Sequence, residues 1–460
     1  MNQPEKGSKK LLNAWAFYDW ANSVYTLTIA SSIFPIFYSA LFVSQVEKNV
    51  EAFGFVFKST ALITYVTAFT FLVVTFTSPI LSGVADYVGN KKNFMKFFCY
   101  LGGAGCIGLY WFSLDQIHLS LLFYFMGLIG YWGSLVFYNS YLPDIAFPNQ
   151  QDAVSAKGFS LGYIGSVLLL LLNLGMVMYP HWFGFDTSIS SSLSETGSEI
   201  QIAEALKEAK DNAALRAMRV AFITVGIWWI LFSQYTFYVL PKGVSKGHKV
   251  TKDVLFNGLR ELRQVWKQLK QNFRLKRYLT AFFVFSMAVQ TIMLVAVYFG
   301  EEEIAWGDDE AKTFGLIVSI LVIQVVAILG AFLTSRASAK FGNIKTLIVV
   351  NFIWMGLCFY AYFMETPFQF YVAASIVGFV MGGVQALARS TYSKFLPETK
   401  DTTSYFSFFD VAEKIGIVIG MVIFATIDQI TGSMRNAILF LFVFFLFGII
   451  LLFRVPKENV

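Results

Sequence analysis

Long apolar segments recur along the whole chain, and each is long enough to cross a lipid bilayer. A membrane-spanning helix needs about 20 predominantly apolar residues. Of the 460 residues, 56% are hydrophobic and only 14% are charged, whereas soluble domains carry about 25% charged residues. The pattern therefore predicts an all-α membrane protein with twelve transmembrane helices, at approximately residues 14–43, 58–84, 94–114, 117–142, 157–180, 217–240, 277–299, 312–335, 344–364, 367–393, 403–428 and 434–454.

The polar, lysine-bearing start of the chain superficially resembles a signal peptide. The apolar run that follows is much longer than the about 7–15 residues of a signal core, so we expect an uncleaved first helix. The three cysteines and three histidines show no metal-ligand spacing, and we predict no cofactor or metal. The net charge of +6 calls for no nucleic-acid partner.

Basic and acidic residues alternate between successive connections. Lys91, Lys92 and the segment 242–277 are basic, whereas segments 195–208 and 301–309 are rich in Glu and Asp. Lys and Arg concentrate in the cytoplasmic connections of membrane proteins. We therefore expect both termini and the central connection to be cytoplasmic.

Two connections are predicted to form helices outside the membrane. Residues 194–215 have the pattern of a short amphipathic helix. The central connection, 241–276, combines one apolar helical face with basic residues; these are Leu255, Leu259, Leu262, Trp266, Leu269 and Phe273, with Arg260, Arg263, Lys267 and Lys270. Such a helix is expected along a lipid surface. A plain positive-inside linker is the favoured interpretation of its role, and a regulatory or partner-binding role is the alternative.

The second half of the chain repeats features of the first at a nearly constant offset. SGVADYVGNKKNFM from Ser82 matches SRASAKFGNIKTLI from Ser335, and the Leu-Pro-Asp of 142–144 matches the Leu-Pro-Glu of 396–398. These matches indicate a six-plus-six duplication. We expect an N-terminal half at 1–240 and a C-terminal half at 277–460, joined by the basic linker.

This architecture resembles the major facilitator superfamily. The hallmark loop of that superfamily, between the second and third spans, corresponds here to Gly83, Asp86, Gly89, Lys91 and Lys92, with Gly83 one residue closer to the aspartate than usual. The resemblance implies a cytoplasmic gate formed by these residues. The alternative is a tight turn whose lysines only set orientation.

The first span narrows the resemblance. AFYDWANSVY, starting at Ala16, is similar to the signature of the vacuole-effluxer and "unknown major facilitator" group, related to autophagy-linked amino-acid exporters. The group implies a twelve-span carrier, with neutral amino-acid efflux as the activity commonly attached to it. The compact loops favour a bacterial inner-membrane protein over a eukaryotic exporter.

Polar residues within the spans are the candidate transport residues, because ionisable groups in a membrane are costly and usually functional. In the first span, Asp19, Asn22 and Tyr25 follow one another at three-residue intervals. Asp19 is a candidate proton- or cation-coupling acid, and Asn22 a candidate substrate ligand. The equally weighted alternative is an acid that pairs with a basic residue on a neighbouring span.

The eleventh span carries Asp410, Glu413 and Lys414. Asp410 and Lys414 are one helical turn apart and can pair, which leaves Glu413 as the odd charge. The three residues suit a zwitterion, with a carboxylate for its ammonium and Lys414 for its carboxylate. A static salt-bridge cluster is the alternative.

The tenth span adds Gln385 and Arg389, also one turn apart. Arg389 is a possible partner of Asp19 or Glu413, although snorkelling to the cytoplasmic surface is slightly favoured. The single amides within the spans are expected to be structural rather than ligand-binding; they are Asn139, Asn173, Gln290 and Gln324.

These features together predict a monomeric secondary transporter that moves a small solute, with a coupled proton or cation, by alternating access. No phosphate-binding loop and no K⁺-filter motif is present in the sequence, which disfavours a primary pump and a channel. No catalytic constellation points to an enzyme. A non-transporting membrane sensor or lipid-handling protein on the same scaffold is the alternative.

Overall fold

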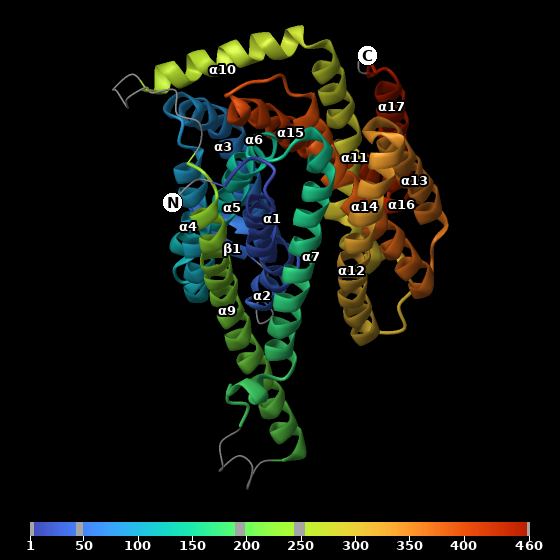
Figure 1. The fold of residues 1–460 in the computed structure, drawn as a ribbon. Coiled ribbons are helices and arrows are strands. Elements are labelled where there is room, and N and C mark those ends of the chain that lie inside the picture. The colour runs from blue at the N-terminus through green and yellow to red at the C-terminus, as the bar shows by residue number, and fades with distance from the viewer. Residues whose placement is uncertain (1–3, 43–48, 189–197, 243–253, 458–460) are drawn as a thin grey trace.

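The computed structural model describes residues 4–42, 49–188, 198–242 and 254–457. Long helices run side by side through the molecule (Figure 1). The short α6 and the helix α10 lie at the same end as the chain termini, and we call this end the terminal end.

The N-terminal part of the chain forms one bundle of helices with a small hairpin. The hairpin is antiparallel and joins β1 (Asn49–Ala52) to β2 (Phe55–Lys58). The helical elements are α1 (Lys9–Val24), the π-helix η1 (Tyr25–Ala30), α2 (Ile33–Ala40), α3 (Ser59–Val88), α4 (Lys91–Gly108), the 3-10 helix η2 (Leu109–Trp111), α5 (Ile117–Asn139), α6 (Leu142–Ile145), α7 (Pro148–Met178), the 3-10 helix η3 (Pro180–Phe183) and α9 (Glu199–Val239).

The C-terminal part forms a second bundle, preceded by a helix that lies across the terminal end (Figure 1). That crossing helix is α10 (Val254–Gln271). The bundle consists of α11 (Phe273–Glu303), α12 (Asp309–Phe341), α13 (Asn343–Phe363), α14 (Pro367–Phe395), α15 (Thr402–Thr431), α16 (Met434–Phe440) and α17 (Phe442–Phe453).

Each predicted span falls on one helix or on consecutive helical elements of the structure; the first span, for example, covers α1, η1 and α2, and its last residue lies outside the described part. Ten of the described helices are long and apolar enough to cross a membrane. The third and eleventh predicted spans correspond to α4 and α15, which carry several ionisable residues. The multi-pass, all-α architecture is thus confirmed, and the count of twelve crossings stays a prediction.

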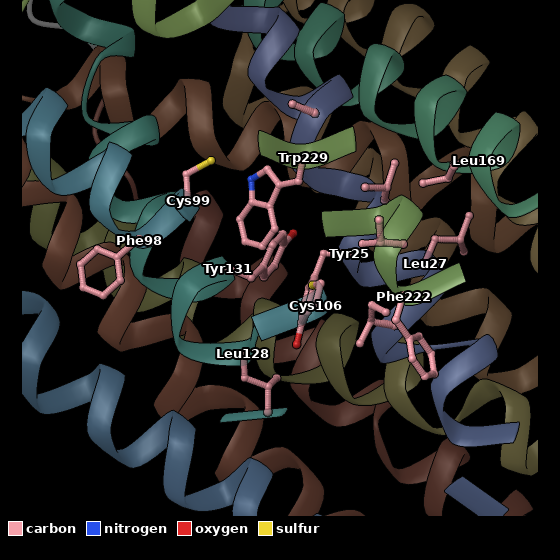
Figure 2. Packing of buried hydrophobic residues seen from close by; sticks show 14 of the residues in the cluster. Tyr25, Leu27, Phe98, Cys99, Cys106, Leu128, Tyr131, Leu169, Phe222 and Trp229 are labelled. Carbon is pink, nitrogen blue, oxygen red and sulfur yellow. The ribbon is translucent and has the colours of Figure 1, made fainter. Parts of the chain in front are cut away.

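Aromatic and small residues pack the N-terminal bundle. The ring of Tyr25 stacks on Tyr131 with centroids 5.1 Å apart and lies 5.8 Å from Trp229 (Figure 2). Beside them, α4 and α5 approach so closely that a Cβ on Gly130 would lie 2.3 Å from the Cα of Gly102. Glycine is required at this crossing because any side chain would separate the two backbones.

Two large hydrophobic clusters form most of the core of the described residues, and a small third cluster of Ala156, Ala331 and Ala386 lies between the bundles. Apart from Tyr163, the buried members of one lie between Leu11 and Leu240 and those of the other between Val265 and Val455. The two bundles meet where α7 packs against α12 and α14, and where α3 packs against α15. These contacts surround the molecule's central cavity.

The sixth span differs from its prediction. Residues 199–239 form a single helix of 41 residues, so the short outer helix expected at 194–215 is in fact the start of α9. Residues 194–197 lie outside the described part. Between Glu199 and Val225 the sequence contains neither Gly nor Pro, and nothing therefore interrupts the helix where it leaves the apolar segment.

The apolar residues of α10 also differ from their prediction, because they divide between two sides of the helix. Val265 and Leu269 are buried against the protein, whereas Leu259 and Trp266 are exposed. Phe273, which was expected on the same face, is the first residue of α11. The side chain of Leu255 lies outside the described part. The helix thus packs on the protein in addition to presenting an apolar edge.

Candidate functional site

A cavity of about 290 Å³ lies between the two bundles. This volume is at the low end for a small-molecule site. Its polar lining comes from both bundles: Asp19, Ser23, Thr26, Ser31, Tyr131, Asn139, Tyr163, Ser166, Ser286, Gln290, Gln324, Gln385, Arg389 and Glu413. Aromatic side chains fill much of the remaining wall, among them Trp132 and Phe159.

A buried ion pair between the bundles forms the most charged part of this lining. The Nη2 of Arg389 lies 3.2 Å from Oδ2 of Asp19, and Tyr138 donates a 2.8 Å hydrogen bond to the same oxygen. The exposed fraction is 3% for Arg389 and 4% for Asp19. The snorkelling expected for Arg389 is therefore wrong, because its guanidinium points inward to α1.

The other donors of Arg389 are also satisfied. Its Nε donates to Ser155 Oγ at 3.0 Å, Nη2 donates to the Ser155 carbonyl at 3.0 Å, and Nη1 donates to Asn139 Oδ1 at 3.2 Å. The guanidinium carbon also lies 4.2 Å from the ring centre of Phe159. This dense set of partners offsets the desolvation that a buried cation would otherwise suffer.

Gly158 of α7 permits this arrangement. A Cβ at that position would lie 2.4 Å from Asp19 Oδ2 and 3.1 Å from Arg389 Nη2. The absence of a side chain therefore lets α7 close over the ion pair. Gly162, one turn further along α7, likewise leaves room for Ser23, because a Cβ there would lie 2.4 Å from Ser23 Oγ.

A second acid lies on the C-terminal side of the cavity. Glu413 accepts a 2.7 Å hydrogen bond from Nε2 of Gln290. No ion pair of Glu413 occurs among the residues that the structure describes. Its carboxylate is therefore available to a cationic group in the cavity.

The neighbouring pair on α15 lies behind the wall. Asp410 and Lys414 form the predicted one-turn ion pair, and Lys414 has an exposed fraction of 1%. Its ammonium lies 4.8 Å from the ring centre of Trp132, a residue that does line the cavity. Asp410 and Lys414 themselves are not part of the lining.

Of the candidate residues predicted in the first span, one lines the cavity and the others lie behind its wall. Asp19 lines the cavity, whereas Asn22 and Tyr25 are buried among the N-terminal helices and contribute nothing to the lining. Ser23 and Thr26 take their place. Asp19, Ser23 and Thr26 are spaced by four and three residues, so ordinary α-helical periodicity places them on one face, whereas Tyr25, six residues after Asp19, points elsewhere.

Amides that were expected to be structural make up much of the lining. Asn139, Gln290 and Gln324 line the cavity, as does the predicted Gln385, which accepts a 3.0 Å hydrogen bond from Tyr163. Asn173 behaves as expected, since it is fully buried and accepts a hydrogen bond from Thr224. Single intramembrane amides carry no sequence signal that separates the two cases.

At the terminal end, the loop after α3 joins the two bundles. Asp86 accepts hydrogen bonds from the backbone N–H groups of Thr403, at 3.3 Å, and Ser404, at 2.6 Å. Both lie in the first turn of α15, where N–H groups have no partner within the helix and the helix dipole favours a negative charge.

Lys91 adds a second link from the same loop. Its buried ammonium donates to Asp144 at 2.5 Å, to the Ser140 carbonyl at 2.9 Å and to Thr402 Oγ1 at 3.0 Å. Lys92, by contrast, donates to the Leu240 carbonyl at 2.6 Å and stays within the N-terminal bundle.

Glycine is needed at positions 89 and 83 for two different structural reasons. Gly89 has φ = 71° and ends α3 in the left-handed conformation, which glycine adopts without strain. Gly83 faces α10, because a Cβ there would lie 2.3 Å from the carbonyl oxygen of Gly258.

A matching link comes from a residue that the sequence did not single out. Asp152, near the start of α7, pairs with Lys394 at 2.6 Å. It also accepts hydrogen bonds from Ser338 at 2.8 Å and from Asn343 at 2.9 Å. The second copy of the loop, in which Ala339 replaces the aspartate, therefore joins the bundles through an acid of the opposite bundle.

Comparisons with known proteins place the chain in a family. Residues 7–460 match the family model described as vacuole effluxer Atg22 like. The chain is 30% identical to an uncharacterized MFS-type transporter, YxiO, of Bacillus subtilis, over 97% of this chain and 95% of that protein. It is 22% identical to autophagy-related protein 22 of Eremothecium gossypii, over 94% of this chain and 87% of that protein.

A solved structure shares the fold. The E. coli fucose:proton symporter FucP aligns with a TM-score of 0.67 at 15% identity, over 98% of both chains. Together with the two bundles around a central cavity, these matches show that the chain belongs to the Atg22-like vacuole-effluxer family of major facilitator superfamily transporters.

Proposed function

We propose that this secondary transporter carries a small zwitterionic solute, of the neutral amino-acid class, and couples its movement to protons. The observation that carries the proposal is that Arg389 and Glu413, from α14 and α15, line one small cavity with opposite charges. A zwitterion presents a carboxylate to the first and an ammonium to the second. Gln290 and Gln385 add neutral hydrogen-bonding groups beside them.

The coupling proposal rests on the partners of Arg389. Asp19 occupies two of its N–H groups at 3.2 and 3.3 Å, so the substrate carboxylate competes with Asp19 for the same guanidinium. Protonation of Asp19 removes its negative charge and weakens this competition. Proton binding at Asp19 and carboxylate binding at Arg389 would thus favour each other. Asn22 and Tyr25 support α1 from behind in this scheme, and Asp410 with Lys414 supports Glu413.

We further propose that residues 1–240 and 277–460 move against each other as two bodies, joined by 241–276. The described hydrogen bonds between the bundles lie in the region between the terminal end and the level of Tyr163 and Gln385. This distribution suits a state closed at the terminal end and open at the other. Asp86 and Lys91 would then belong to the gate, with Gly83, Gly89 and Lys92 shaping its loop.

Charge asymmetry supports a cytoplasmic terminal end, and the Bacillus relative supports a bacterial plasma membrane. The site is complete within one chain, which suits a monomer. Transport would then expose the cavity alternately to the outside and to the cytoplasm.

The test is uptake into proteoliposomes that contain the purified protein. We expect net uptake of a radiolabelled neutral amino acid, with alkalinisation of the compartment that supplies the protons. Glu413→Gln should raise the apparent KM of uptake at least tenfold, whereas Glu398→Gln, an exposed acid at the terminal end, should leave it unchanged. Ligand binding without any flux would contradict the proposal and favour a sensor. Uptake that ignores Glu413→Gln would contradict the proposed site.

A further inference from the structure

The helix α10 has three chemically distinct sides. Gly258, Val265 and Leu269 are buried and face the bundles. The residues of a helix that recur every seven positions lie on nearly one line, because seven residues make about two turns. Leu259 and Trp266 form such a line along one edge, each with an exposed fraction of 42%, and Phe256 is exposed next to it.

The remaining sides of α10 are polar, but not in the same way. Beside the apolar edge, exposed basic residues point away from the protein; these are Arg260, Arg263, Lys267 and Lys270. The opposite edge carries Glu261 and the uncharged Gln264, and no basic residue. An apolar edge flanked by basic residues on one side only is the pattern of a helix that lies in the interface of an anionic membrane.

The buried side of α10 touches both bundles. On the N-terminal side, its backbone meets α3 where Gly258 packs on Gly83, and Asn257 donates a 3.1 Å hydrogen bond to Tyr87. On the C-terminal side, it meets α15 through two contacts. Tyr405 donates a 3.1 Å hydrogen bond to Gln268, and the ring of Trp266, which belongs to the apolar edge and is only half-buried, lies 5.2 Å from the ring of Phe408.

We propose that the exposed edge of α10 binds anionic phospholipids of the leaflet at the terminal end, and that the bound lipid holds this end closed. The phosphate groups pair with the basic side chains, and the apolar edge enters the interface beneath them. A helix so anchored keeps its contacts with α3 and α15 together. At the terminal end, α3 and α15 are also joined directly by Asp86 and Ser404. Because α10 contacts both helices, they can separate only if α10 loses its contacts with α3 or with α15.

Lipid retention by the full-length protein tests the binding. The protein is purified from bilayers of equal phosphatidylglycerol and phosphatidylcholine, and the bound lipids are counted by native mass spectrometry. We expect preferential retention of phosphatidylglycerol. Each basic residue near an anionic surface contributes about fivefold, so the triple change Arg260→Gln, Arg263→Gln and Lys267→Gln should weaken retention roughly a hundredfold.

A matched triple change controls for net charge. Lys340→Gln, Lys345→Gln and Lys457→Gln remove the same charge from exposed positions at the same end, and this variant should retain phosphatidylglycerol as the unmodified protein does. All six positions are exposed, and size-exclusion profiles should be unchanged. Equal retention by both triple variants, or equal retention of the two lipids by the unmodified protein, overturns the proposal.

The effect on conformation is measured as a distance between spin labels. Asn93→Cys and Lys400→Cys place labels on exposed positions at the terminal end of each bundle, while the three native cysteines are buried. In phosphatidylglycerol nanodiscs the short distance between the two labels, which corresponds to a closed terminal end, should dominate. In phosphatidylcholine the long-distance population should rise at least threefold, and the α10 triple variant should show this rise in both lipids. Identical distributions in the two lipids would refute the closing role.

Discussion

Asp86 accepts a 2.6 Å hydrogen bond from the backbone N–H of Ser404, so the end of one helix in the N-terminal bundle closes the start of a helix in the other. The contact is made to a backbone group, and it is therefore independent of the side chain at position 404. Its strength depends on the negative charge of Asp86, because the first-turn N–H groups of α15 carry the positive end of the helix dipole.

Asp86→Asn should open the terminal end. A hydrogen bond to a charged group contributes about 1.5–3 kcal/mol, so the closed population should fall roughly tenfold or more. Alkylation of an introduced cysteine at Ser23, in the cavity, by a reagent supplied from the terminal end should speed up accordingly. Lys92→Gln is the matched control, since Lys92 bonds within its own bundle. Equal alkylation rates in both variants would show that Asp86 is no gate.

Asp19→Asn should destabilise the protein, because it leaves Arg389 buried without a counter-charge. Breaking a buried pair from one side costs about 3–5 kcal/mol. Asp19→Asn combined with Arg389→Met should be more stable than Asp19→Asn alone, since no charge then remains buried. Thermal unfolding in detergent, followed by tryptophan fluorescence, compares the two. If the double variant is the less stable one, the pair does not act as a unit.

Gly158→Ala should destabilise the protein and disturb transport together. The added methyl group would lie 2.4 Å from Asp19 Oδ2, and overpacking of this kind costs about 1–3 kcal/mol. Gly356→Ala is the control on α13, because a Cβ there meets nothing within 4 Å. That change should be neutral or stabilising by up to about 1 kcal/mol. Melting temperatures that shift equally would argue against a specific role of Gly158.

Glu413→Gln and Lys414→Met should have different effects, although the two residues are adjacent. Glu413 lines the cavity, so its loss should raise the apparent KM at least tenfold with little change in melting temperature. Lys414 is buried beside Asp410, so its loss should lower the melting temperature first. Initial uptake rates and melting curves of the two variants decide the matter. A raised KM with an unchanged melting temperature for Lys414→Met would place that residue in the substrate path.

Hydropathy and length located the spans, because a bilayer imposes both directly on the sequence. The positions of the buried acids were visible for the same reason: Asp19 and Glu413 interrupt apolar segments. Their surroundings were not visible. Asp19 and Arg389 are 370 residues apart in the chain, and only the packing of α1, α7 and α14 decides that they meet.

Asp152 had no sequence signal of its own. An acid near the start of a helix is common because the helix dipole favours it, and nothing in its neighbours indicates Lys394 as a partner. The two sides of α10 were likewise hidden. Leu262 and Leu269 lie close to Leu259 and Trp266 on a helical projection, and the contact of Gly258 with Gly83 determines which of them is covered. The continuous α9 was predictable, since the stretch before its apolar part contains no helix-breaking residue.

The length of α9 gives the N-terminal bundle a lever. Its 41 residues extend over about 60 Å at 1.5 Å per residue, roughly twice the thickness of a hydrocarbon core. A rotation of the bundle by roughly ten degrees about the terminal end of α9 would sweep the far tip of the helix through about 10 Å. Under the proposed two-body movement, a small pivot at the terminal end would become a large displacement at the far tip, where an antibody fragment or a fluorophore would register it.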